Sequence, residues 1–166
     1  VLDLACGGGD VTVQVAKILK QVGVSAEVHG WDCSQTAIDF ARRQQNHANP
    51  SLVHFDVANA LTDAAHQSFD VVYCTLFLHH LSDEDSIQLL SAMWKMAGHL
   101  VLIDDLRRST VGYVLAVVGC RLLSRSPIVH VDGPLSVRAA FTESEILELS
   151  DRSNLPRPKI NRHWPH

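Results

Sequence analysis

The sequence predicts an α/β fold in three layers, with a doubly wound, mostly parallel sheet covered by helices on both faces. Three observations lead to this prediction. Short apolar segments alternate five times with segments of helical period. Three consecutive glycines, Gly7–Gly9, follow the first apolar segment, where a strand would turn into a helix. The chain has 166 residues, 46% of them hydrophobic, which is enough for one domain with a real core.

The first part of the chain carries the alternation. Val1–Leu4 is apolar apart from Asp3 and suits a central strand buried on both faces. The helix after the glycines should reach about Gln21, with Asp10 or Thr12 as its cap. The other expected strands are residues 26–32, 52–57, 69–78 and 99–106. The other expected helices, Ser34–Gln45 and Ser82–Ala97, each begin at a serine that can cap them.

The pattern changes after Asp105. Residues 109–124 predict a mostly apolar helix, and residues 126–134, with proline near both ends, predict an irregular loop. Residues 141–153 predict a helix in which Thr142 and Glu145 form a capping box. The tail has room for one strand near residues 159–163.

Charge and cysteine usage exclude several classes of protein. The formal net charge is −4, and residues 100–166 hold only 9 Lys/Arg against 7 Asp/Glu, so nucleic acid is not the expected main partner. No apolar run is long enough to predict stable membrane insertion, and no signal peptide opens the chain. The four cysteines match neither a zinc module nor a disulfide framework. We therefore expect reduced thiols, a cytoplasmic location and no metal site.

The glycines and two aspartates predict a nucleoside site. Gly7–Gly9 leave room for a ligand at the start of a helix, although a G-x-G-x-x-G dinucleotide fingerprint would need glycine where Thr12 stands. Asp32 ends the second expected strand, where its carboxylate can accept both hydroxyls of a ribose, and Asp56 ends the third. A tight turn without a ligand remains the alternative for the glycines alone.

Four segments together resemble the class I S-adenosylmethionine-dependent methyltransferases, which have a Rossmann-like fold. "VLDLACGGG" is similar to the glycine-rich first motif of that family, "HGWDCS" to its second-strand acid motif, "HFDVANAL" to its adenine-contacting segment and "FDVVYCTLFLHHLSDED" to its fourth-strand motif. These motifs cover residues 1 to about 106. Many members have glycine where this chain has Ala5, a substitution that looks mild because alanine is small.

The resemblance implies S-adenosyl-L-methionine as the cofactor and assigns residues to it. Ala5, Gly7 and Gly9 would line its methionine part, and Asp3 would lie under that part and help to organise the amino group. Asp32 would hold the ribose, and Asp56 with Val57 would contact the adenine edge. Two further residues, Cys33 and Tyr73, are named as possible neighbours of the cofactor, although core packing is the preferred interpretation of Tyr73.

The expected reaction is methyl transfer to a small acceptor. His79 and His80 follow the fourth strand, and an imidazole can remove a proton near neutral pH, although a purely structural role is the alternative. Asp104, His130 and Arg138 are the expected polar groups on the acceptor side. "IDDLRRS" is similar to the strand-five ending of ubiquinone/menaquinone-type methyltransferases. The acceptor is therefore expected to be lipophilic or aromatic, methylated at oxygen or carbon.

Residues 1–166 are interpreted as one methyltransferase domain, with a cofactor-binding core over residues 1–106 and acceptor-side helices and loop over residues 107–166. The resemblance implies a preceding helical cover and a further last strand, so we interpret the chain as a fragment; a minimal protein with exposed sheet edges is the alternative. A nicotinamide-dependent oxidoreductase and a non-catalytic S-adenosylmethionine-binding domain are the alternative functions. The oligomeric state, a dimer included, is left open.

Overall fold

The computed structural model describes residues 1–45, 53–63 and 67–163. They form two compact units, which we treat separately. Unit 1 comprises Val1–Thr75 and Gln88–Asp104, and unit 2 comprises residues 76–87 and 105–166. The chain therefore passes from unit 1 into unit 2 at the end of each of two strands.

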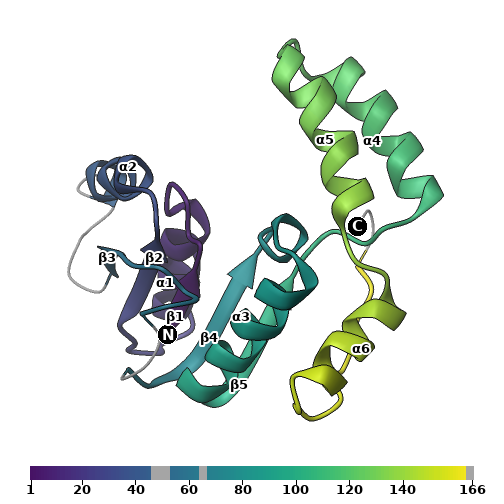
Figure 1. Ribbon diagram of the computed structural model, residues 1–166. Coiled ribbons are helices and arrows are strands. Elements are labelled where there is room, and N and C mark those ends of the chain that lie inside the picture. Colours follow the sequence, from purple (N-terminus) through teal and green to yellow (C-terminus); the bar gives the residue numbers. More distant parts are fainter. Residues whose placement is uncertain (46–52, 64–66, 164–166) are drawn as a thin grey trace. The chain divides into compact units, whose positions relative to one another are not determined.

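Unit 1 is built on a five-stranded sheet in the order β3-β2-β1-β4-β5, in which every neighbouring pair is parallel (Figure 1). Its strands are β1 (Leu2–Leu4), β2 (Val28–Asp32), β3 (Val53–Val57), β4 (Phe69–Thr75) and β5 (Ala97–Asp104). The predicted doubly wound α/β fold is confirmed. Because all five strands run in the same direction, their carboxyl ends lie at one edge of the sheet.

Helices α1 (Asp10–Gln21) and α2 (Gln35–Gln45) pack on β2 and β3. The core at the contact of α2 with β3 contains Ile38, Ala41, Val53 and Phe55. Helix α3 (Asp83–Met96) buries four apolar side chains, those of Leu89, Leu90, Met93 and Met96. The predicted serine caps are confirmed, since the Ser34 and Ser82 hydroxyls accept hydrogen bonds from backbone N–H groups in the first turns of α2 and α3.

The start of α1 differs from the prediction. Gly9, in a left-handed conformation, is the N-cap, and no side chain caps the helix. Asp10 is exposed, and Thr12 is fully buried because it bonds to a strand residue instead. Two strand starts also shift, since β2 begins at Val28 and β5 at Ala97. Leu52, expected in the third strand, lies outside the described residues.

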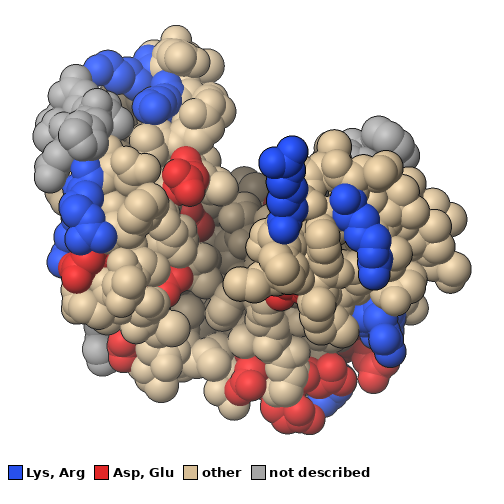
Figure 2. Space-filling view, turned by 90° about the horizontal axis from the view of Figure 1, so that it is seen from above, with Lys and Arg blue, Asp and Glu red and all other residues tan. Residues whose placement is uncertain are grey.

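Unit 2 contains a 3-10 turn, η2 (Leu78–His80), and helices α4 (Thr110–Leu123), α5 (Pro127–Ala139) and α6 (Glu143–Arg152). Helices α4 and α5 pack against each other. Their outer surfaces remain apolar, with Leu122, Leu123 and Ile128 more than three-quarters exposed. In Figure 2 this helix pair, on the right, shows mainly uncharged side chains between separate Lys or Arg residues.

The loop predicted over residues 126–134 is wrong, because this segment is the first part of α5. Pro127 occupies the first turn, where a missing N–H costs no helical hydrogen bond. Pro134 removes one bond inside the helix but is buried together with Val137. Gly133 also packs so close to Cys120 of α4 that a Cβ would lie 2.4 Å from the cysteine sulfur. Packing against α4 therefore outweighs the local signal of the prolines.

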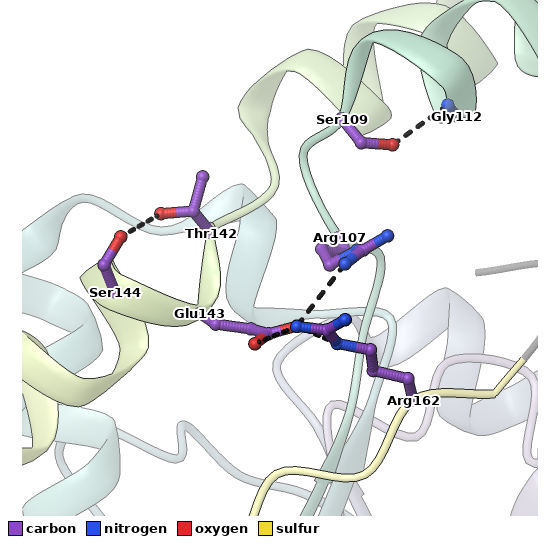
Figure 3. Close-up of polar contacts among 7 residues, drawn as sticks. All are labelled: Arg107, Ser109, Gly112, Thr142, Glu143, Ser144 and Arg162. Carbon is purple, nitrogen blue, oxygen red and sulfur yellow. Dashed lines mark hydrogen bonds and ion pairs between the residues drawn. The ribbon is translucent and has the colours of Figure 1, made fainter.

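The end of unit 2 confirms one prediction and overturns another. Thr142 and Glu145 form the expected capping box of α6. No strand forms at residues 159–163, because Pro156 and Pro158 precede them and no described strand pairs with them. Arg162 instead binds both carboxylate oxygens of Glu143, at 2.6 and 2.8 Å, and Arg107 also reaches Glu143 (Figure 3).

Candidate functional site

The turn between β1 and α1 has an unusual backbone. Ala5, Gly7 and Gly9 have φ angles of 56°, 53° and 78°, in the left-handed region that favours glycine. A Cβ at Gly7 would meet nothing within 4 Å, whereas a Cβ at Gly9 would lie 2.5 Å from the Phe55 ring. Gly9 is therefore needed for packing, while Gly7 faces open space that a ligand can occupy. Alanine at position 5 is not a mild substitution, because its side chain sits in a strained conformation.

Asp32 fastens this turn to the end of β2. One of its carboxylate oxygens accepts a hydrogen bond from the Gly7 backbone N–H at 2.9 Å. The other accepts one from the Ser34 N–H at 2.8 Å. Each oxygen keeps a further lone pair, so the partly exposed carboxylate can still accept two hydroxyls of a ligand. The next residue, Cys33, is exposed at the same end of the strand.

A buried polar cluster lies under the turn. Asp3 is 1% exposed, and its Oδ2 accepts a hydrogen bond from the Thr12 hydroxyl at 2.6 Å. Tyr73 is paired with Asp3 across β1 and β4, which places the two residues at adjacent positions of the sheet. Among the described residues, neither Asp3 Oδ1 nor the Tyr73 hydroxyl has a hydrogen-bond partner. Burial raises the pKa of Asp3 to about 6, although the Thr12 hydrogen bond opposes this shift.

The end of β3 is more exposed. Asp56 lies 3.8 Å from the Arg42 guanidinium, and both side chains are about half exposed. Arg42 also donates two hydrogen bonds to the Phe55 carbonyl, which covers part of the free edge of β3. Val57 is 44% exposed beside Asp32, with which it is paired in register. An apolar surface and a carboxylate therefore lie next to Asp32, the residue predicted to hold a ribose.

Unit 2 holds the two histidines predicted to be catalytic. His79 Nδ1 lies 2.6 Å from Asp105 Oδ1, and its backbone N–H donates to the other oxygen of Asp105. The two side chains are only 4% and 11% exposed. Because the carboxylate accepts from Nδ1–H, Nε2 carries the lone pair, and it has no hydrogen-bond partner among the described residues. His80 is exposed, with its ring centroid 4.1 Å from that of His79.

The three predicted acceptor-side residues do not form one cluster. Asp104, the last residue of β5, is exposed in unit 1, and its side chain makes no hydrogen bond or ion pair with another described residue. His130 Nε2 binds the Ser124 carbonyl at 2.7 Å, so it ties the α4–α5 connection together. Arg138 is exposed on α5 and likewise has no described partner. Their role toward an acceptor remains a prediction.

Sequence reasoning missed two residues of these clusters. Asp105 was not paired with His79, because 26 positions separate them, although its place directly after a strand was a signal. Thr12 was interpreted as one of two possible caps, and no signal in the sequence pointed to its buried hydrogen bond with Asp3. Within the described ranges no group of three or more His, Cys, Asp or Glu residues could hold a metal ion. No helix there has the length and apolar character needed to span a membrane.

Comparison with known proteins gives a consistent match. Residues 1–98 match the family described as methyltransferase domain. The chain is 35% identical over 124 residues to the ubiquinone biosynthesis O-methyltransferase of Thiobacillus denitrificans, covering 74% of this chain and 51% of that protein. It is 33% identical over 172 residues to the enzyme of the same name from Albidiferax ferrireducens, covering 99% and 66%. The chain spans about half to two thirds of the length of the curated relatives it matches.

Solved structures share the fold. Magnesium protoporphyrin IX methyltransferase from Synechocystis PCC 6803, crystallised with SAH, matches with a TM-score of 0.64 at 20% identity, over 92% of this chain and 62% of that one. The plantazolicin methyltransferase BamL, in complex with a triazolic desmethylPZN analog and SAH, matches with a TM-score of 0.68 at 21% identity, over 92% of this chain and 52% of that one.

Proposed function

The chain belongs to the class I S-adenosylmethionine-dependent methyltransferases, and we propose that it transfers a methyl group from S-adenosylmethionine to an oxygen of a small aromatic or lipophilic acceptor. The observation that carries the proposal is the glycine turn between β1 and α1, which a hydrogen bond from the Gly7 N–H to Asp32 fixes in place. This turn, Asp32 itself and the buried Asp3 and Tyr73, each of which has a side-chain oxygen without a hydrogen-bond partner among the described residues, all belong to unit 1.

The described residues fit the cofactor. Gly7 leaves the space that a bound molecule needs, because a Cβ there would meet no protein atom. The Asp32 carboxylate has acceptor capacity left for two ribose hydroxyls. Asp3 and Tyr73 leave buried polar atoms unsatisfied, which is costly unless a ligand or water completes them. Val57 and Asp56 supply an apolar face and a polar edge for the adenine.

When bound, the cofactor supplies an already activated methyl group on a sulfonium. The protein then has to position the acceptor, exclude water and, for a hydroxyl acceptor, remove a proton. His79 suits the last task, because Asp105 fixes its Nδ1–H tautomer and leaves Nε2 as the base. We propose that His79 takes the acceptor proton and that His80, exposed beside it, lies on the acceptor side.

The acceptor class is supported by two observations. Both curated relatives described above are named as O-methyltransferases of ubiquinone biosynthesis. Helices α4 and α5 expose many apolar side chains and the unpartnered cation Arg138, which suits an apolar molecule with an anionic or polar group. We also propose a cytoplasmic location, because Cys6, Cys33 and Cys120 are thiols rather than disulfides.

Isothermal titration calorimetry with S-adenosylhomocysteine tests the cofactor, and mass spectrometry of a catechol incubated with S-adenosylmethionine tests the transfer. We expect binding of S-adenosylhomocysteine and a product heavier by one methylene group, with NADH giving no binding heat. Binding of NADH but not of S-adenosylhomocysteine would favour an oxidoreductase. Binding of S-adenosylhomocysteine with no turnover of catechol, phenol or carboxylate probes would favour the non-catalytic domain.

The base is tested by His79→Gln, with His99→Gln as the control, since both variants remove one imidazole and His99 is exposed and is assigned no part in the site. Loss of a general base costs roughly 10²–10⁴-fold in turnover, with little change in cofactor affinity. A His79→Gln variant as active as the His99→Gln control would show that proximity alone drives the reaction.

A further inference from the structure

Asp3 is a buried acid for which the described residues offer no cation. Its carboxyl group is 1% exposed, and Thr12 satisfies only one of the two oxygens. No Lys, Arg or His of the described chain forms an ion pair with it. A buried carboxylate without a partner is costly, so burial of this kind usually points to a charge supplied from outside the chain or to a neutral acid.

Burial and the charge of Asp32 raise the pKa of Asp3, whereas Thr12 and Tyr73 act in the opposite direction without outweighing burial. Asp32 of β2 adds a like charge, Cys6 of the turn is a thiol whose own pKa burial raises to about 12, and Tyr73 of β4 is a buried phenol whose pKa burial also raises. Thr12 of α1 contributes one hydrogen bond and no charge. The environment of the free protein therefore favours the protonated acid well above the usual pH range of aspartate.

We propose that Asp3 makes cofactor binding proton-linked: its neutral carboxyl group releases a proton to solvent when the α-ammonium group of the bound methionine part arrives. This inference rests on the proposed function, because it needs an amino-acid ligand at the glycine turn. Asp3 lies on β1 directly before the turn whose Gly7 faces open space. The low-dielectric surroundings strengthen the attraction between the carboxylate and a cation, whether they touch or a water lies between them.

The direction of the effect follows from linkage. The free protein holds the Asp3 proton below a pKa of about 6. A cationic ligand binds the ionised form better, so affinity should rise as the pH increases through this pKa and level off above it. At pH 5 about ten of every eleven Asp3 side chains are protonated, which predicts roughly tenfold weaker binding than at pH 7.5. At pH 6 about half a proton should leave per ligand bound.

Two ligands that differ in the ammonium group provide the decisive comparison. S-adenosylhomocysteine carries the amino-acid part, whereas 5′-methylthioadenosine keeps the nucleoside and the sulfur and lacks it. We would titrate each into the chain by calorimetry between pH 5 and pH 7.5, in buffers of different ionisation enthalpy that report the protons released. The expected result is a roughly tenfold rise in affinity for S-adenosylhomocysteine and a constant affinity for 5′-methylthioadenosine.

Variants assign the proton to Asp3. Asp3→Asn keeps a group that can bond to Thr12 and cannot ionise, so its affinity for S-adenosylhomocysteine should no longer change with pH. Asp70→Asn removes the same charge from an exposed position at the start of β4 and should keep the full pH dependence. If Asp3→Asn does not fold, the comparison of the two ligands on the unchanged chain still tests whether cofactor binding is proton-linked through the ammonium group.

Three results would overturn the inference while leaving the proposed function intact. They are an affinity for S-adenosylhomocysteine that does not change with pH, an equal pH dependence for both ligands, and an Asp3→Asn variant that retains the tenfold change. Failure of S-adenosylhomocysteine to bind at any pH is a different outcome, because it would refute the proposed function and this inference with it.

Discussion

Replacing Asp32 by alanine should damage both the fold and the ligand site, because its carboxylate serves both. In the free protein the side chain accepts hydrogen bonds from the backbone N–H groups of Gly7 and Ser34, at 2.9 and 2.8 Å. A hydrogen bond to a charged group contributes about 1.5–3 kcal/mol. Asp32 is partly exposed, so water can replace it at both N–H groups, and we expect a loss of about 1 kcal/mol at each.

The effect on binding comes on top of this loss of stability. Two hydroxyl bonds to the carboxylate, worth about 1.5–3 kcal/mol together after exchange with water, correspond to roughly 10- to 150-fold in the dissociation constant of S-adenosylhomocysteine. The loosened Gly7 turn should add to this loss. Asp70→Ala is the matched control, since Asp70 lies at the start of β4, is assigned no contact with the ligand and makes an exposed ion pair with His99.

Urea unfolding measures the first effect, and calorimetric titration below the urea transition measures the second. We expect the Asp32→Ala chain to lose about 2 kcal/mol of unfolding free energy and the Asp70→Ala chain to lose less than half of that. An Asp32→Ala chain as stable as the unchanged one would refute the role of the carboxylate in the turn. A folded Asp32→Ala chain with unchanged affinity would refute the ribose assignment.

Three further predictions concern unit 1, each measured by urea unfolding. Ala5→Gly should raise the unfolding free energy by about 0.5–1 kcal/mol, because relief of the left-handed strain exceeds the entropy that glycine adds to the unfolded chain; a less stable variant would contradict this. Gly9→Ala should lower the unfolding free energy by about 2–5 kcal/mol, since residue 9 has a left-handed backbone and its Cβ would lie 2.5 Å from the Phe55 ring. Gly7→Ala should lower it by only about 1 kcal/mol and should chiefly weaken S-adenosylhomocysteine binding. Equal losses of stability in the two variants would show that Phe55 moves aside. Folding raises the pKa of Asp3 from 3.8 to about 6, so the folded protein binds this proton more tightly than the unfolded chain. The unfolding free energy should therefore be highest below pH 4 and should fall by up to about 3 kcal/mol as the pH rises through 6. This loss should be missing in Asp3→Asn, and the same pH dependence in both chains would rule out Asp3 as its source.

Local signals in the sequence were sufficient for much of the fold. Ser34, Ser82 and Thr142 act as the predicted caps, because a cap needs only a side-chain oxygen and the N–H groups of the next turn. The alternation of apolar and amphipathic segments predicted the parallel sheet, because each strand of such a sheet must be buried on both faces. The glycines and Asp32 marked the candidate site, since the glycine turn and the carboxylate at the end of the next strand are both visible within one β-α-β segment.

Contacts between distant segments decided the rest. Residues 126–134 became helical because packing against Cys120 and its neighbours outweighs the prolines. Residues 159–163 stayed irregular because a strand requires a partner edge, which the sequence of the segment cannot reveal.

The features of the Asp3 and His79 clusters also came partly from the local sequence and partly from tertiary contacts. The sequence by itself determined which acids, glycines and histidines stand at the ends of strands, because that follows from local periodicity. Only the tertiary structure decided that Asp105 orients His79, that Asp3 is buried without a cation and that Ala5 is strained. Partners, burial and backbone strain depend on which segments meet in the folded chain, and this is set by the packing of the whole chain rather than by any one segment.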